Sequence, residues 1–224
     1  MANGNTGAQR PASGPARDGR RPTPQVERRA LSEGRIIASA LRIIAEKGVQ
    51  GMTLADAGER AGYSRGLPAH LFGSRAELMR QCALSLSEQV WQDTMPVRDA
   101  DSALEAIEGA VTAWIDLLQA RPAFARAYYL MAAESLRDTD QPEPFALVVR
   151  DFSNRGQARF ATIIADGVAA GEFASAVDAQ AESWLIHATL RGIGMQWLLR
   201  PDLIDLPLLT GALTENLRRH ILTR

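Results

Sequence analysis

The chain has 224 residues, of which 46% are hydrophobic and 23% charged. This balance is that of an ordinary globular protein, and it excludes a fibrous chain or one that is disordered throughout. No uninterrupted apolar run approaches the ~20 residues of a membrane span, and no apolar stretch near the N-terminus predicts a signal peptide. The single cysteine, Cys82, excludes an internal disulfide and a cysteine-rich zinc site. We therefore expect a cytoplasmic protein with no membrane partner.

The formal net charge of -1 hides an asymmetry along the chain. Residues 1–80 carry 13 Lys and Arg against 7 Asp and Glu, whereas residues 81–224 carry 12 against 19. Residues 1–31 are rich in arginine, glycine and proline and hold few apolar side chains, so we predict a disordered basic arm there. Such an arm either binds a polyanion by counterion release or is only a solubilising tail, and composition leaves both open.

A first helix is predicted from about Ser32 to Lys47. Apolar residues recur there at three- and four-residue spacing, and Gly48 stands where a left-handed cap would end the helix. Thr53 can then cap a second, short helix over 54–61. Gly62 allows a turn before a third short helix over 65–72.

Gly73 ends the third helix, and a fourth helix follows it directly. Ser74 and Glu77 have the spacing of a capping box at its start. Two short helices joined by a glycine-containing turn and supported by a longer helix form the helix-turn-helix arrangement, which places its second short helix in the major groove of DNA.

Residues 33–80 strongly resemble the DNA-binding domain of the tetracycline-repressor (TetR/AcrR) family of transcriptional regulators. The most diagnostic runs are AGYSRG at 61–66 and FGSR at 72–75, followed by Glu77 and Leu78. Ala69 and Leu71 depart from the family, which usually has an aromatic residue at the first position and often a histidine or aromatic one at the second. The resemblance therefore implies DNA binding, with an operator that is read differently.

Position and chemistry together predict which residues contact DNA. Arg65 can bind a phosphate or guanine, His70 can donate to phosphate, and Leu67 can pack on a thymine methyl group or only on protein. Gly66 either lets the backbone approach DNA or relieves crowding between helices. Thr53 and Ser74 start helices whose free amides face phosphates, although capping alone would explain both. The predicted set is Thr53, Ser64, Arg65, Gly66, Leu67, His70, Ser74 and Arg75.

The rest of the chain is predicted to be helical too, so the fold class is all-α. The expected spans are 101–120, 122–137, 144–170, 177–199 and 207–222, separated by proline- and glycine-containing breaks. The resulting domains are the arm at 1–31, the helix-turn-helix domain at 32–80 and a larger helical domain at 81–224. In the resembled family this last domain binds a small ligand and forms a homodimer through its last two helices.

Two sets of apolar residues are candidates for those roles. An apolar ligand cavity could be lined by Trp114, Tyr128, Tyr129, Met131, Trp184, His187 and Met195. The dimer interface could contain Trp184, Ala188, Trp197, Leu209, Leu213 and Leu217. Packing within one chain is the alternative explanation for both sets.

The sequence offers no site for classical catalysis. The three histidines His70, His187 and His220 are far apart and have no partner at metal-ligand spacing, so we expect no enzyme, cofactor or metal. We predict a homodimeric regulator, a repressor that binds a palindromic double-stranded operator and is released by an unknown small-molecule effector. The alternative is a helical ligand-binding or scaffold protein of the same fold that does not use DNA.

Overall fold

The computed structural model describes residues 24–94, 100–137 and 140–222, together with Met1. Every regular element in these ranges is a helix, which confirms the predicted all-α class. The helices are α1 (Pro24–Lys47), α2 (Leu54–Arg60), α3 (Leu67–Phe72), α4 (Arg75–Thr94), α5 (Ala103–Ala120), α6 (Pro122–Glu134), α7 (Pro144–Ala169), α8 (Ala179–Leu199) and α9 (Leu206–Leu222). None of them is both long and apolar enough to cross a membrane.

Helix α1 begins eight residues before the predicted start at Ser32, so the predicted arm is too long. Proline is tolerated in a first helical turn, where its missing amide has no helical partner, so Pro24 can open the helix. Arg29 and Glu33 are one turn apart and form an ion pair at 2.8 Å, which supports the added turns. The remainder of the predicted arm, residues 2–23, lies outside the described residues.

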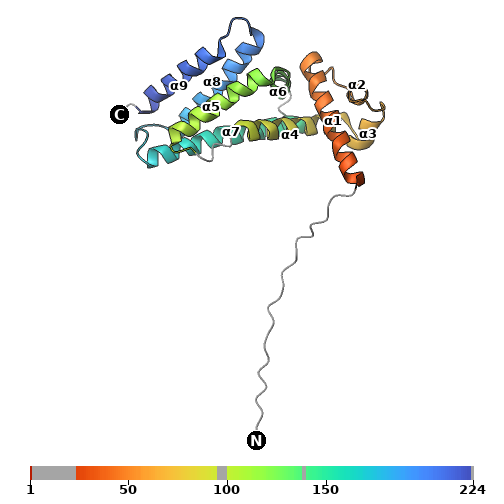
Figure 1. Cartoon of the computed structure of the whole chain (residues 1–224), viewed down its shortest axis with the longest axis horizontal. Coiled ribbons are helices and arrows are strands. Elements are labelled where there is room, and N and C mark those ends of the chain that lie inside the picture. The colour runs from red at the N-terminus through yellow and green to blue at the C-terminus, as the bar shows by residue number, and fades with distance from the viewer. Residues whose placement is uncertain (2–23, 95–99, 138–139, 223–224) are drawn as a thin grey trace.

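Helices α1, α2 and α3 form a small bundle at one end of the molecule (Figure 1). The buried face of α1 includes Ile36, Ile43 and Ile44, and Leu78 and Met79 from the start of α4 are fully buried in the same hydrophobic core. Each of these helices has an apolar stripe on one face only, so none can bury that stripe alone.

Helix α4 joins this bundle to the rest of the protein. It runs from the α1–α3 end along α7 into the larger group formed by α5 to α9 (Figure 1). The predicted domain boundary after Arg80 therefore falls inside one continuous helix. At about 1.5 Å per residue, α4 spans roughly 30 Å.

Candidate nucleic-acid interface and ligand cavity

The predicted turn between α2 and α3 is present, and two glycines make it possible. Gly62 has a φ of 81°, a conformation that favours glycine. A Cβ atom on Gly58 would lie 2.8 Å from Cγ of Pro68, so only glycine lets α2 and α3 approach this closely. Thr53 caps α2 by accepting a hydrogen bond from the Asp56 amide at 3.1 Å. The close contact at Gly58 and the turn at Gly62 therefore fix the position of α3 relative to α2.

The outer face of α3 and the turn before it are exposed. Ser64, Arg65, Gly66 and His70 all lie on this surface. Helix α3 starts at Leu67 and not at Arg65 as predicted, so Ser64 and Arg65 lie in the preceding turn. Arg65 forms an exposed ion pair with Glu59 at 3.0 Å. Exposed pairs contribute little to stability, so this guanidinium can exchange its partner for a phosphate at small cost.

Gly66 has no packing role toward the residues that the structure describes. A Cβ atom at this position would have no neighbour within 4 Å, and its φ of -85° is open to any residue. The idea that Gly66 relieves crowding between helices is therefore wrong. A small residue here leaves the outer surface of α3 open to close approach by another molecule.

Leu67 and Arg75 are more involved with the protein than predicted. Leu67 is half-buried and packs against the hydrophobic core. Arg75 donates hydrogen bonds to the carbonyl oxygens of Met52 at 3.0 Å and Val49 at 2.6 Å. It therefore fixes the connection between α1 and α2, which the sequence could not show because the two carbonyls are more than 20 residues away.

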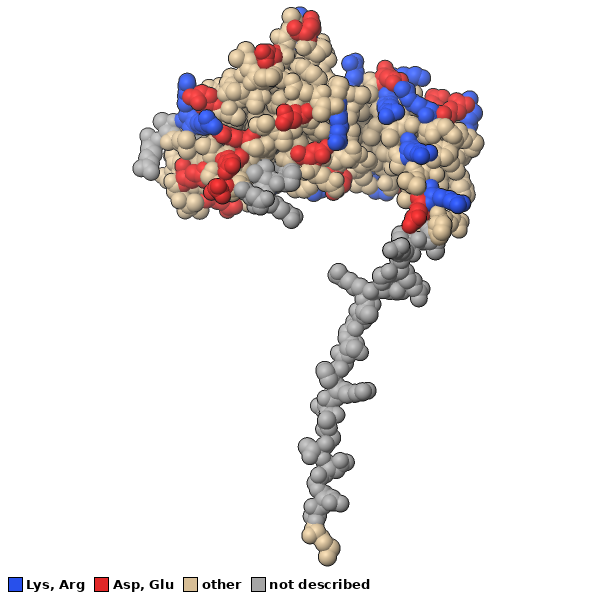
Figure 2. All heavy atoms as spheres, viewed as in Figure 1, with Lys and Arg blue, Asp and Glu red and all other residues tan. Residues whose placement is uncertain are grey.

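Ser74 caps α4 as predicted, accepting a hydrogen bond from the Glu77 amide at 3.1 Å. The Glu77 carboxylate accepts hydrogen bonds from Arg80 and Gln81, and these lower its pKa to about 2. Ser74 itself remains exposed beside α3. On the face shown in Figure 2, basic side chains gather over the α1–α3 end with some acidic ones among them, and acidic side chains gather over the other end.

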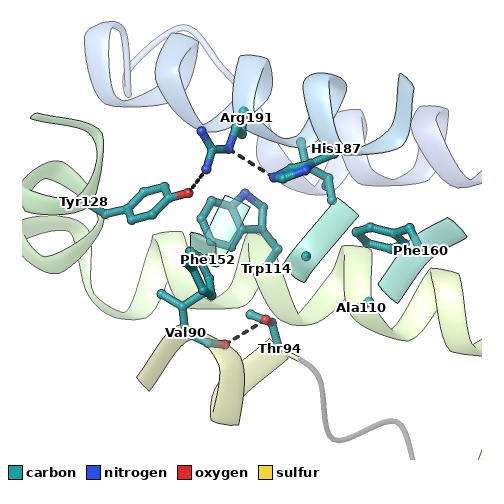
Figure 3. A pocket seen from close by; sticks show the side chains of 11 residues that line it. Val90, Thr94, Ala110, Trp114, Tyr128, Phe152, Phe160, His187 and Arg191 are labelled. Atoms are coloured by element: carbon teal, nitrogen blue, oxygen red, sulfur yellow. Dashed lines mark hydrogen bonds between the residues drawn. The ribbon is translucent and has the colours of Figure 1, made fainter. Parts of the chain in front are cut away.

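A cavity of about 40 Å³ lies inside the larger group of helices (Figure 3). It is formed by side chains from five helices, α4 to α8: Val90, Thr94, Ala110, Trp114, Tyr128, Phe152, Gly156, Phe160, His187, Leu190 and Arg191. Most of these are apolar or aromatic, as is usual for small-molecule sites. The space holds roughly three water molecules at the ~10–15 Å³ that each needs.

Three of the seven predicted ligand residues, Trp114, Tyr128 and His187, line this cavity. The other four do not. Tyr129 is buried beside it, where its hydroxyl donates to the carbonyl of Arg191 at 3.0 Å, and Met131 is fully buried in the core. Trp184 and Met195 are 49% and 38% exposed, because they lie on the outer face of α8.

Among the eight lining residues that the sequence did not predict, Arg191 is the one with a charged side chain. Its Nε donates to Nε2 of His187 at 3.1 Å, and its Nη2 donates to the Tyr128 hydroxyl (Figure 3). The guanidinium also lies 5.3 Å from the centre of the Tyr128 ring. The one available signal was its spacing, since it follows His187 by one helical turn.

Two polar atoms of the cavity lining have no hydrogen-bond partner among the described residues. They are Nε1 of Trp114 and Nδ1 of His187. Burial, and then the nearby charge of Arg191, lower the pKa of His187 to about 4, so its ring is neutral at pH 7. Arginine can only donate, so Nε2 of this neutral ring must accept and Nδ1 must carry the proton. Both unpartnered atoms are therefore donors.

The predicted dimer stripe on α9 is partly wrong. Leu217 is only 7% exposed, and Leu213 packs against the core, because α9 turns this face toward α5 and α8 of its own chain. Trp197 is likewise half-buried against the core. Exposed residues of α8 instead follow one another at three- and four-residue spacing: Trp184, Ala188, Gly192, Met195 and Leu199. We call these five residues the α8 stripe.

Comparison with known proteins identifies both halves of the chain. Residues 36–82 match the family model of bacterial regulatory proteins of the tetR family, and residues 103–222 match the C-terminal domain of BetI-type transcriptional repressors. The transcriptional regulator CymR of Pseudomonas putida is 28% identical over 189 residues, which cover 80% of this chain and 85% of CymR. BetI of Burkholderia ambifaria is 33% identical over 92 residues, which cover 39% of this chain and only 47% of BetI.

Solved structures show the same fold. A transcriptional regulator from Saccharomonospora viridis in complex with choline has a TM-score of 0.76 and 17% identity, and the match covers 87% of this chain and all of that one. FadR from Bacillus subtilis in complex with stearoyl-CoA has a TM-score of 0.67 and 16% identity, over 81% of this chain and 95% of FadR.

These relatives are regulators of transcription and not enzymes, and they do not favour the alternative of a scaffold that makes no use of DNA. The family model of the C-terminal domain alone covers more than half of the chain. The helix-turn-helix bundle, the larger helical domain and these matches agree, and the chain belongs to the TetR family of DNA-binding transcriptional regulators.

Proposed function

We propose that this regulator is a cytoplasmic repressor that binds a palindromic operator as a homodimer and leaves it when a small molecule enters the cavity. The observation that carries the proposal is the path of α4. Its first turn adjoins the capping residue Ser74 beside α3, and its last turns supply Val90 and Thr94 to the cavity lining. One rigid element therefore contacts both sites.

The size of the cavity supports a coupling between occupancy and movement. Small-molecule sites usually enclose about 300–1,000 Å³, far more than the 40 Å³ found here. An effector larger than a few water molecules must therefore push the surrounding helices apart, and α4 is one of them. A ligand shifts a population only by its difference in affinity for the two conformers. A conformer with a wider cavity and a displaced α4 would be favoured by the effector.

Displacement of α4 would matter because of dimer geometry. The two recognition helices of a dimer must reach successive major grooves about 34 Å apart. In this chain α3 would enter the groove, with Arg65 and His70 contacting DNA and the Ser74 end of α4 near a phosphate. A change in the angle of α4 in each protomer alters the distance between the two α3 helices and lowers the affinity for the operator.

The α8 stripe is the surface proposed for the dimer. It is apolar and lies on one face of a helix, and a Cβ atom on Gly192 at its centre would have no neighbour within 4 Å. Such a face permits close packing of a second helix. In a homodimer with twofold symmetry the same surface serves both protomers.

Protection mapping tests this function directly. The purified protein is incubated with DNA from the region upstream of its own gene, and the protected sequence is determined at several salt concentrations. We expect two protected half-sites in inverted repeat, with centres about 10 base pairs apart or a multiple of that distance. Protection of a single half-site, or of no specific site at any salt concentration, would refute the proposed mode of binding.

A further inference from the structure

Arg191 is a cation in the cavity lining that has no carboxylate partner among the described residues. Its side-chain hydrogen bonds within the described residues go to the neutral groups of His187 and Tyr128. By contrast, the arginines that the structure describes in ion pairs lie mostly at the surface, as Arg65 does in its pair with Glu59. A partly buried guanidinium without an anion is costly, and an anion supplied from outside would offset that cost.

The uncharged groups around the cavity point to the same chemistry. Nε1 of Trp114 and Nδ1 of His187 are donors that find no acceptor in the part of the chain that the structure describes. The Tyr128 hydroxyl accepts from Arg191, which leaves its own proton available to a ligand. In Figure 3, Trp114 reaches from α5 toward Arg191 and His187, so these donors gather on one side of the cavity. A carboxylate has only acceptors and is the complementary group.

The opposite side of the cavity is mostly apolar, and the hydroxyl of Thr94 on that side donates its proton to the carbonyl oxygen of Val90 (Figure 3). Phe152 and Phe160 from α7 and Val90 from α4 form much of it. These side chains can bury a hydrocarbon group but cannot satisfy a second charged or strongly polar one. The two sides together therefore describe a ligand with one anionic end and one apolar end.

We propose that the effector is an organic carboxylate with an apolar body, whose carboxylate is bound by Arg191 with the donors of Tyr128, His187 and Trp114. This inference rests on the proposed function of the cavity as the effector site. The carboxylate accepts hydrogen bonds from Arg191, and the hydrocarbon body lies among the aromatic side chains of α7. The same guanidinium repels a cationic ligand, so a quaternary ammonium compound is excluded.

Calorimetry on the full chain without DNA tests the proposal. The probes are benzoate, phenylacetate and the straight-chain carboxylates from acetate to decanoate, with the matched neutral amides and choline as comparisons. We expect at least one carboxylate to bind about tenfold or more tightly than its amide, and choline not to bind. Equal binding of the amide, binding of choline in preference to the carboxylates, or no binding by any carboxylate would overturn the proposal.

Two variants locate the charge that is responsible. Arg191→Gln should lower the affinity for the carboxylate about tenfold or more and leave that for the amide within about twofold, and Arg191→Lys should restore part of the loss. Arg200→Gln removes an exposed arginine from the end of the same helix and should change neither affinity. Unchanged carboxylate binding in Arg191→Gln would overturn the assignment. If these variants do not fold, the comparison of carboxylate, amide and choline binding to the unaltered protein still tests whether the cavity selects an anion.

A separate measurement distinguishes this inference from the proposed function. The carboxylate that binds most tightly is added to the complex of the protein with its operator. Release of the DNA supports both the anion site at Arg191 and the proposed release of the repressor by a ligand in the cavity. If the carboxylate binds through Arg191 but does not release the DNA, the anion site is supported and its role as the effector site is refuted. If only a neutral or cationic compound releases the DNA, the anion site is refuted and ligand-controlled repression is supported.

Discussion

Nε of Arg191 donates a hydrogen bond to Nε2 of His187 at 3.1 Å, one helical turn earlier on α8. This contact requires a neutral imidazole, because a protonated ring has no acceptor for the guanidinium. Burial of the ring and the charge of Arg191 lower the pKa of His187 to about 4 from its ordinary value of 6.5. The pair therefore makes folding sensitive to acid.

The first prediction is a loss of stability at low pH. In the unfolded chain His187 becomes protonated below about pH 6.5, whereas in the folded chain its ring stays neutral until the pH falls to about 4. The stability associated with the neutral ring is thus complete above pH 6.5 and is lost as the pH falls toward 4, by up to about 3 kcal/mol. Urea unfolding at pH 7 and pH 4.5 should show a smaller decrease for His187→Gln than for the unaltered protein. An equal decrease would show that His187 titrates normally.

The second prediction concerns close approach of DNA to α3. Gly66→Leu places a side chain in open space, so the free energy of unfolding should change by less than about 1 kcal/mol. The added side chain should nevertheless block the groove and weaken operator binding about tenfold or more, as measured by fluorescence anisotropy. Gly34→Leu on α1 also enters open space and serves as the control. Full operator affinity in Gly66→Leu would remove this position from the interface.

The third prediction concerns the exposed cation next to α3. Arg65→Ala should weaken operator binding and, if the guanidinium contacts a phosphate, should reduce the salt slope of binding by about one unit. Arg137→Ala is a matched control, since its side chain is 67% exposed and ion-paired with Glu134, against 68% and Glu59 for Arg65. We expect the control to bind DNA normally. Identical salt slopes in the two variants would exclude a phosphate contact by Arg65.

His70→Ala belongs to the same surface and should also lower operator affinity, because His70 is exposed near the end of α3. Circular dichroism should show unchanged helicity, since the side chain is not part of the core. Unchanged affinity would indicate that His70 does not contact DNA.

The fourth prediction concerns the dimer. Ala188→Glu places a charge in the middle of the α8 stripe, where it would be desolvated and unpaired in a dimer but solvated in a monomer. Sedimentation should therefore show a helical monomer with reduced operator affinity. Ala158→Glu, at an exposed position of α7, is the matched control and should remain dimeric. A dimeric Ala188→Glu protein would mean that the α8 stripe is not the interface.

The local architecture could be predicted from the sequence because its determinants are local. Thr53 and Ser74 cap helices through amides only three residues away, and Gly62 and Gly73 have the positive φ that their turns require. Periodic apolar residues and these end signals depend on neighbours within one or two turns. The helix-turn-helix arrangement and the family resemblance follow from the same short stretch of chain.

The ligand cavity and the exposed surfaces were decided by the tertiary structure. An apolar stripe has the same sequence pattern whether it faces its own core or a second chain, so Leu217 and Ala188 could not be told apart. In the sequence Arg191 is indistinguishable from a solvent-exposed arginine on a helix, because its partner Tyr128 lies 63 residues earlier and is brought into contact only by the fold. The packing of five helices around one small space determines which side chains meet there, and no spacing within a single helix records that arrangement.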